Sequence, residues 1–355
     1  MNQQELMEWN IGYSLDQLAS LDVRGYGVSQ VLYKAARQYT GEPLSMHSAR
    51  SLCRLLEKGD LVYILTGFVL LPHKKGETDG VISAVLLARA LVKAFGVTPV
   101  IICPEENLHA VERLTAVAGM HFYHDIKEAH AYPASLAAVS FTKNVGDAEE
   151  ATNKILAQGI PQAVIAVEAA GANRKGVYHN AGGLDVTELE AKSDVLFNRC
   201  KSFGIWNLAI GDLGNEIGMG TLAPWICKTV PRIGDGQCDC GCQGGILAET
   251  AADHVITATI SDWGCYSLIA AIAFLCDDED ILHSAEMERL MIETASQSGM
   301  VDMYGWLEQA IDGIGVEMHT NLIRMMHHCI SYPRKYVRHN AAWFEQVEAL
   351  HNHED

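Results

Sequence analysis

Apolar and polar residues are arranged along this chain in blocks that predict helices first and then alternating strands and helices. Residues 1–60 are expected to be helical, because 28–39 and 49–57 carry apolar positions at helical spacing. A nearly continuous apolar run over 61–71 then predicts a buried strand. Residues 81–95 are apolar on most faces and rich in Ala and Leu, which predicts a buried helix.

The same alternation continues to about residue 275. Further strands are predicted at 97–103, 163–167, 205–210 and 255–260, and further helices at 105–118, 187–203, 216–228 and 265–275. Strands that alternate with helices form a mostly parallel sheet covered on both faces. We therefore predict an α/β fold with a doubly wound, Rossmann-like sheet. We expect one domain over 1–355, with a helical part at 1–60, a core at 61–275 and a mainly helical part at 276–355.

Composition and charge narrow the classes of partner. The chain has 355 residues, 49% of them hydrophobic, and a net charge of −18, which argues against nucleic acid or an anionic membrane surface as a partner. The first ten residues are polar, and no apolar run reaches the roughly 18 residues of a membrane span. We expect a cytoplasmic protein with reduced cysteines that acts on a small molecule, and a homo-oligomer is left open.

Unusual polar residues gather in four loops, each of which follows a predicted strand. These loops are 76–80, 168–180, 211–220 and 261–264. In open α/β sheets, ligands bind beyond the carboxyl ends of the strands. If the sheet is parallel, all four loops meet at one edge, and this convergence predicts a site more strongly than any single motif does.

The segment 211–220 is the densest of these loops, with four glycines, two carboxylates (Asp212 and Glu216) and the amide of Asn215. Glycines let the backbone approach a ligand, and carboxylates hold a cation or move protons. The spacing G-x-x-G-x-x-x-G-x-G matches neither the dinucleotide motif nor a P-loop, so no nucleotide cofactor is expected. The structural alternative is a helix cap near Glu216, where free amides could also bind a substrate carboxylate.

Glu77 and Asp79 are bracketed by glycines and followed directly by the predicted buried helix. One interpretation is structural, because acidic residues cap helix N-termini and suit the helix dipole. The other is a hard-cation site shared with Asp212 and Glu216, since oxygen ligands suit magnesium or manganese. Binding of a substrate ammonium group is a further option.

The loop 168–180 carries a second set of candidate side chains. Arg174 could hold a carboxylate with two hydrogen bonds, and His179 could move protons near neutral pH. Its other polar candidates are Asn173, Tyr178 and Asn180. Long structured loops are often functional, and the alternative is a plain surface loop.

The motif Cys238-Asp239-Cys240-Gly241-Cys242 raises the question of zinc. Its C-x-C-x-C spacing lacks the paired C-x-x-C knuckles of structural zinc sites. The residues considered for a fourth ligand are Cys227, Cys265 and His254. Nothing in the sequence selects one of them, so we expect a reduced loop without a metal.

Read together, three of the four loops resemble the D-glutamate cyclase family. The matching segments are 66–68 with 76–80, 176–180 and 211–220, and 261–266 is similar to the family's Ser-Asn-Trp-Gly-x-Tyr. The matches follow the family order from about residue 60 to 275. The chain departs from the family pattern at Leu213, where Gly is usual, at Val81 and Ile82, where Pro is usual, at Asp262, where Asn is usual, and in an expanded 238–242. The departures concern the substrate more than the fold.

The resemblance implies reversible interconversion of D-glutamate and 5-oxo-D-proline, with loss or gain of water, and a divalent metal such as manganese. A cation would help because a carboxylate is a poor electrophile. The expected metal ligands, for Mn²⁺ or Mg²⁺, are Glu77, Asp79, Asp212 and Glu216. The expected catalytic groups are Asp212, Glu216 and His179, and the expected substrate contacts are Asn173, Arg174, Tyr178, Asn180, Gly214, Asn215, Asp262 and Trp263.

Two other classes of function fit the same residues. A metal-dependent hydrolase or phosphohydrolase acting on a small anionic substrate would use the same carboxylates, although a phosphate would favour more Lys and Arg near the site. A non-catalytic amino-acid-binding protein would keep the acidic residues without taking up metal.

Overall fold

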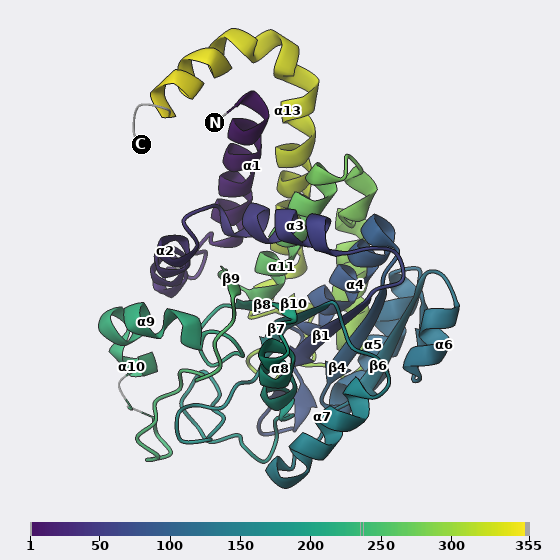
Figure 1. Ribbon diagram of the computed structural model, residues 1–355. Coiled ribbons are helices and arrows are strands. Elements are labelled where there is room, and N and C mark those ends of the chain that lie inside the picture. The colour runs from purple at the N-terminus through teal and green to yellow at the C-terminus, as the bar shows by residue number, and fades with distance from the viewer. Residues whose placement is uncertain (1, 235, 237, 352–355) are drawn as a thin grey trace.

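A computed structural model describes residues 2–234, 236 and 238–351 and is built around a seven-stranded sheet (Figure 1). The strands lie in the order β5-β6-β4-β1-β7-β8-β9, and every neighbouring pair is parallel. Their bounds are β1 (Leu61–Gly67), β4 (Thr98–Cys103), β5 (His121–Tyr123), β6 (Ser135–Ser140), β7 (Ala163–Ala169), β8 (Trp206–Gly211) and β9 (His254–Thr257). This confirms the predicted doubly wound, Rossmann-like α/β fold.

The centre of the sheet explains why its strands were visible in the sequence. Residues 62–65 of β1 are fully buried, as is all of β7 apart from slight exposure at its end. A parallel strand covered on both faces is a continuous apolar run. From β1 the chain builds β4, β5 and β6 on one side and then β7, β8 and β9 on the other, so the strand order reverses between β1 and β7. Ligands bind beyond the carboxyl ends of strands at such a reversal.

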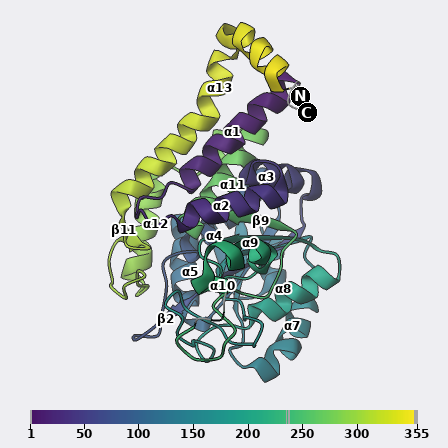
Figure 2. The ribbon, with the colours of Figure 1, turned by 90° about the vertical axis from the view of Figure 1, so that its left-hand side faces the viewer.

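Helices cover both faces of the sheet (Figures 1 and 2). Helix α4 packs on β1 and β4 and against α11, which lies on β7, β8 and β9, whereas α8 covers β7 and β8 and packs against α7. The bounds are α1 (Gln3–Ala19), α2 (Val28–Thr40), α3 (Leu44–Leu55), α4 (Val81–Phe95), α5 (Glu105–Val117), α6 (Ile126–Ala131), α7 (Ala148–Leu156), α8 (Ser193–Ser202), α9 (Ala223–Thr229), α10 (Pro231–Gly234), α11 (Ser261–Leu275), α12 (Ala285–Gln297) and α13 (Val316–His351). The predicted N-terminal helices and the helix at 81–95 are confirmed.

Two predicted helices are wrong in extent. The stretch 216–228 does not begin as a helix, because Glu216 forms an antiparallel bridge with Ala170 and α9 starts only at residue 223. Gly218 has φ +90°, and a Cβ there would lie 2.2 Å from the Cβ of Ala209, so this backbone is a tight turn against β8. The helix predicted at 187–203 is likewise shortened to α8. The elements β5, β6, α6 and α7 were not predicted.

Two short hairpins lie outside the main sheet. They are β2–β3 (Val69–Leu70 with Lys75–Gly76) and β10–β11 (Ala310–Ile311 with Ile314–Gly315). The second turns through Asp312 and Gly313, with φ +54° and +73°, which is the conformation that Asp-Gly favours in two-residue hairpin loops. Thr78 donates its hydroxyl to the carbonyl of Ala310 and its amide to that of Val301, so the C-terminal segment packs against the loop after β1.

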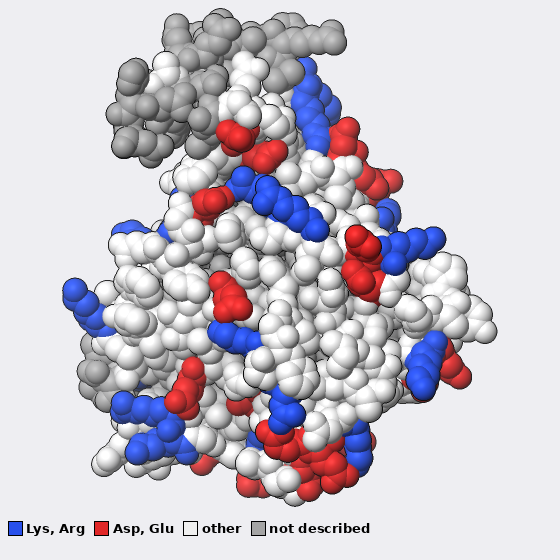
Figure 3. Space-filling model, viewed as in Figure 1, with Lys and Arg blue, Asp and Glu red and all other residues white. Residues whose placement is uncertain are grey.

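The outer surface carries both signs of charge. In the view of Figure 3, lysines and arginines lie scattered among acidic residues. Within the described part of the chain, no helix combines the length and the apolar character needed to cross a membrane.

Candidate active site

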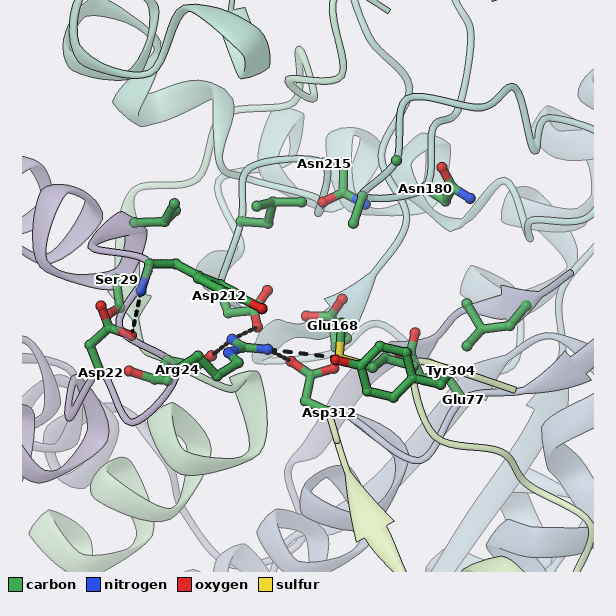
Figure 4. A pocket seen from close by; sticks show the side chains of 18 residues that line it. Asp22, Arg24, Ser29, Glu77, Glu168, Asn180, Asp212, Asn215, Tyr304 and Asp312 are labelled. Carbon is green, nitrogen blue, oxygen red and sulfur yellow. Dashed lines mark hydrogen bonds and ion pairs between the residues drawn. The ribbon is translucent and has the colours of Figure 1, made fainter. Parts of the chain in front are cut away.

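A cavity of about 390 Å³ opens at the carboxyl ends of the central strands (Figure 4). Three of the four predicted loops contribute to its wall, as do two segments outside the core. Its polar lining includes Asp22 and Arg24 before α2, Glu77 after β3, Glu168 at the end of β7, Asn180, Asp212 and Asn215 from the loops, and Tyr304 and Asp312 from the C-terminal part. The predicted convergence on one edge of the sheet is therefore confirmed for these three loops, whereas 261–264 is not a loop but the first turn of α11.

Asp212 lies at the centre of the carboxylates in this cavity. It belongs to two groups, Asp79–Asp212–Asp312 and Glu168–Asp212–Glu216, and in each group one carboxylate oxygen from every residue lies within 4.8 Å of those from the other two. Burial, followed by the charges of Asp312 and Glu216, raises the pKa of Asp212 well above its ordinary value. Carboxylate oxygens this close are the donor set of a hard divalent cation, so these residues fit Mg²⁺ or Mn²⁺.

Arg24 is the counter-charge that the structure places among these acids. Its Nη1 lies 2.9 Å from Asp312 Oδ2 and its Nη2 lies 3.8 Å from Asp212 Oδ2, as Figure 4 shows. It also donates to the carbonyl of Thr259. Burial alone would lower the pKa of Arg24, but the two carboxylates raise it, so the guanidinium stays charged. No sequence pattern predicted a contact between Arg24, in the linker before α2, and Asp312, in a hairpin turn 288 residues further along the chain.

Asp79 and Asp262 cap each other's helices. Asp79 accepts hydrogen bonds from the amides of Asp262 (2.9 Å) and Ser261 (3.2 Å), at the start of α11. Asp262 accepts from the amides of Gly80 (2.8 Å) and Ser83 (3.3 Å), at the start of α4. Burial raises the pKa of Asp262 to about 7. Asp79 is therefore a helix cap, but it caps α11 and not α4, the helix that follows it in the chain. It also belongs to the carboxylate group Asp79–Asp212–Asp312.

Glu168 is the extra residue of a β-bulge. The register pairs Thr66 with Val167 and Gly67 with Ala169, which leaves Glu168 unpaired with φ +44°. Its Oε2 accepts a hydrogen bond from Ser261 Oγ at 2.5 Å. Bulges beside active sites redirect a side chain, and a strained non-glycine residue held in place is a signal of function.

The surroundings of Glu168 keep its proton tightly bound. Burial first, and then the charges of Glu216 and Asp212, raise its pKa well above the ordinary value. A Cβ on Gly80 would lie 2.4 Å from the Cβ of Glu168, so the loop after β3 leaves room for this carboxylate only because residue 80 is glycine. Glu168 was not among the predicted site residues. Its sequence signal is its position as the first residue of the predicted loop 168–180, directly after an apolar strand.

Glu216 shapes the loop that carries Asp212. Its Oε1 accepts the amides of Asp212 (2.9 Å) and Leu213 (2.8 Å), and its Oε2 accepts that of Gly214 (2.6 Å). The expected helix N-terminus at 215–218 does not exist, and the neighbouring amides already have this partner. Glu216 thus fixes the loop from within while remaining in one of the two carboxylate groups.

The predicted substrate contacts are divided between the cavity and its surroundings. Asn180 and Asn215 line the cavity, and Asn215 Nδ2 donates to the carbonyl of His179 at 3.0 Å. Tyr178 is buried and donates its hydroxyl to Asp194, and the indole of Trp263 donates to His319. Their roles as substrate contacts stay predictions.

The side chains of three other predicted residues point to the segment 240–245. Asn173 Nδ2 donates to the carbonyl of Gly245 at 2.6 Å, and Arg174 donates to that of Gln243 at 3.1 Å. His179 Nε2 lies 3.1 Å from Cys240 Sγ, and burial lowers the pKa of this imidazole. None of the three is among the residues that line the described cavity.

The family of the chain follows from its match to known proteins. The family model described as "D-glutamate cyclase-like, C-terminal" matches residues 15–327. This chain belongs to that family. It is also 32% identical over 136 residues to the mitochondrial D-glutamate cyclase of Homo sapiens. That alignment covers 37% of this chain and 20% of the human protein, so the chain matches about a fifth of that relative's length.

Replacing Arg24 with Gln is expected to destabilise the metal-free protein by about 3 kcal/mol, because it leaves Asp212 and Asp312 without their counter-charge. The loss is expected to shrink as the pH falls and Asp212, whose pKa burial raises, becomes protonated, and to shrink when Mn²⁺ is added. Urea denaturation at pH 5.5 and 7.5 measures it. Lys34→Gln, at an exposed position of α2, is the matched control. An unfolding free energy equal to that of the wild type would show that the pair contributes nothing.

Proposed function

We propose that this chain interconverts D-glutamate and 5-oxo-D-proline, with loss or gain of water and with the help of a divalent cation. The observation that carries the proposal is the cluster of carboxylates around Asp212, facing Arg24 in a cavity of about 390 Å³, in a member of this family. This volume suits a small amino acid. The buried cation and anions match a substrate that carries two carboxylates and one ammonium group.

The cavity offers a distinct partner for each of the two carboxylates of D-glutamate. Arg24 is its guanidinium donor, and we assign to it one substrate carboxylate, which a planar guanidinium binds with two hydrogen bonds. Asp79, Asp212 and Asp312 would hold the divalent ion. That ion, when bound, supplies Lewis acidity at the γ-carboxyl group.

Cyclisation forms a bond between the α-nitrogen and the γ-carbon and breaks one bond from that carbon to oxygen. The nitrogen loses two protons, and the departing oxygen gains two as it leaves as water. Glu168 is our choice for the group that receives and returns a proton. It lines the cavity, burial raises its pKa well above the ordinary value, and Ser261 holds its carboxylate in place. His179 fits this role less well, since its imidazole faces Cys240.

Leu213 is the residue we connect with the choice of substrate. It lines the cavity beside Asp212, at a position where the family pattern usually has glycine. A side chain there takes space that glycine would leave open, which favours a small substrate over an extended one.

Turnover by the purified protein is the test of the proposed reaction. The protein is treated with EDTA and then assayed with D-glutamate and separately with 5-oxo-D-proline, with and without Mn²⁺, by chiral chromatography. We expect both directions to approach the same ratio, with L-glutamate converted far more slowly. Hydrolysis of 4-nitrophenyl phosphate without cyclisation would favour the hydrolase class instead. Binding of D-glutamate by calorimetry without turnover would favour a binding protein.

A further inference from the structure

Four metal-ligating side chains come together away from the carboxylates. The atoms are the Sγ atoms of Cys238, Cys240 and Cys242 and the imidazole nitrogen of His179, all within 4.8 Å of one another. We propose that these four residues bind one structural zinc ion, which fastens the cysteine loop to the wall of the cavity. The inference concerns metal content and does not rest on the proposed reaction.

The distances fit a tetrahedral ion. The Sγ of Cys238 lies 3.3 Å from that of Cys242 and 3.5 Å from that of Cys240. The Nε2 of His179 lies 3.1 Å from Cys240 Sγ and 3.8 Å from Cys242 Sγ. Around zinc, with bonds of about 2.3 Å to sulfur and 2.0 Å to nitrogen, neighbouring ligand atoms are about 3.5–3.8 Å apart. Small shifts of flexible side chains therefore complete the polyhedron.

The sulfurs are also surrounded by hydrogen-bond donors. The amide of Gly244 donates to Cys242 Sγ at 3.3 Å, and the amide of Cys242 donates to Cys240 Sγ at 3.4 Å. Asn173 Nδ2 adds a third donor, to Cys242 Sγ at 3.4 Å. Donors of this kind stabilise thiolates and orient metal ligands. Asn173 is itself fixed, since its Oδ1 accepts the amides of Lys175 and Val177.

The ligand set selects the metal. Three soft thiolates and an imidazole suit zinc and do not suit Mg²⁺ or Mn²⁺, which prefer oxygen. Four protein ligands leave no open position, which is typical of a structural rather than a catalytic zinc. The carboxylates of the cavity and this sulfur site are therefore expected to bind different metals.

The structure corrects the sequence-based search for a fourth ligand. The group contains none of the three residues considered from the sequence. Cys265 is buried in α11, and the thiol of Cys227 faces the carbonyl of Gly234. The ring of His254 packs against that of Trp206. The fourth ligand is His179, about 60 residues before the motif. This was not visible in the sequence because its loop reaches the cysteines only through the fold.

The zinc ion would fix the position of two side chains that line the cavity, Asn180 and Asn215. His179 directly precedes Asn180, which lines the cavity, and its carbonyl accepts the amide of Asn215, which lines it too. Figure 4 shows both asparagines on the side of the cavity opposite Arg24. As a zinc ligand, His179 is a positioning residue, and this assignment replaces the catalytic role predicted for it.

Metal analysis of the full chain, purified under reducing conditions without chelator, tests the inference. We expect one zinc ion per chain, and at least about a tenfold lower content in His179→Ala and Cys240→Ser. Cys227→Ser and Asp212→Asn are matched controls that should keep their zinc, because neither belongs to the sulfur site. Replacement by Co²⁺ should give thiolate-to-metal absorption in the wild type that is absent from the His179 variant.

Two results would overturn the inference. One is a wild-type protein that is purified under reducing conditions, keeps all its thiols free by mass spectrometry, and neither contains zinc nor takes it up. The other is unchanged zinc in both ligand variants. If Cys240→Ser fails to fold, as judged by circular dichroism, the cobalt spectrum of the wild type still decides. Loss of cyclase activity alone bears on the proposed function and leaves the zinc result intact.

Discussion

Asp212→Asn is expected to lower the rate of D-glutamate cyclisation by at least about 100-fold at saturating Mn²⁺. Asp212 belongs to both carboxylate groups, so its replacement removes a ligand of the divalent ion and also a charge beside Glu168. The amide keeps the shape of the side chain but loses the charge that holds a divalent ion. Turnover over a range of Mn²⁺ concentrations, together with Mn²⁺ binding by calorimetry, measures the effect.

The loss in Asp212→Asn should not come from unfolding. Burial and like charges disfavour the ionised form of Asp212, so a neutral amide is expected to leave the metal-free protein at least as stable as the wild type. Urea denaturation checks this. Asp147→Asn, the same chemical change at an exposed position, should retain full activity. If Asp212→Asn turns over D-glutamate at the wild-type rate, the metal does not act at this residue.

The strands and the edge that carries the site could be predicted because both depend on local or simple topological rules. Residues 61–65 and 163–167 are apolar runs since parallel strands are buried on both faces. The loops after them lie together because parallel strands end at one edge. Helix α4 was predicted with its observed bounds, since an apolar segment followed by Gly96 gives both its burial and its end.

Side chains brought in by tertiary packing could not be predicted. Arg24 lies in the linker before α2, and Asp312 in a turn whose Asp-Gly sequence predicts a hairpin but not where the hairpin docks. The bulge at Glu168 likewise arises from pairing with β1, which no local pattern encodes. The error at 216–228 has a similar origin, because the three amides that Glu216 binds and the contact of Gly218 with Ala209 override a helical preference.

Glu168→Gln is expected to lower kcat by about 100- to 1,000-fold, as removal of a general acid–base group does, with a smaller change in KM. In the wild type, a base with a raised pKa becomes available only as the pH rises, so kcat should increase with pH through that pKa. This limb should be absent from the variant. Steady-state kinetics in both directions between pH 5 and 9 measure both effects. A residue with only a structural role would lower the rate without removing the limb.

The pH dependence of the unfolding free energy of Glu168→Gln is an independent check, and its direction follows from the raised pKa of Glu168. The folded pKa of Glu168 is raised, so the folded state binds this proton more tightly than the unfolded state does. The stabilisation is complete below the unfolded pKa of about 4.3 and is lost as the pH rises through the folded pKa. Glu168→Gln cannot lose a proton, so its unfolding free energy should fall less than that of the wild type over this range.

Ser261→Ala keeps the carboxylate while removing its hydrogen bond, and it should retain the pH dependence of the wild type. If the unfolding free energies of Glu168→Gln and the wild type depend on pH in the same way, the proton transfer belongs to another group of the cavity. Glu77 would then be the next candidate, because it lines the cavity and burial raises its pKa as well.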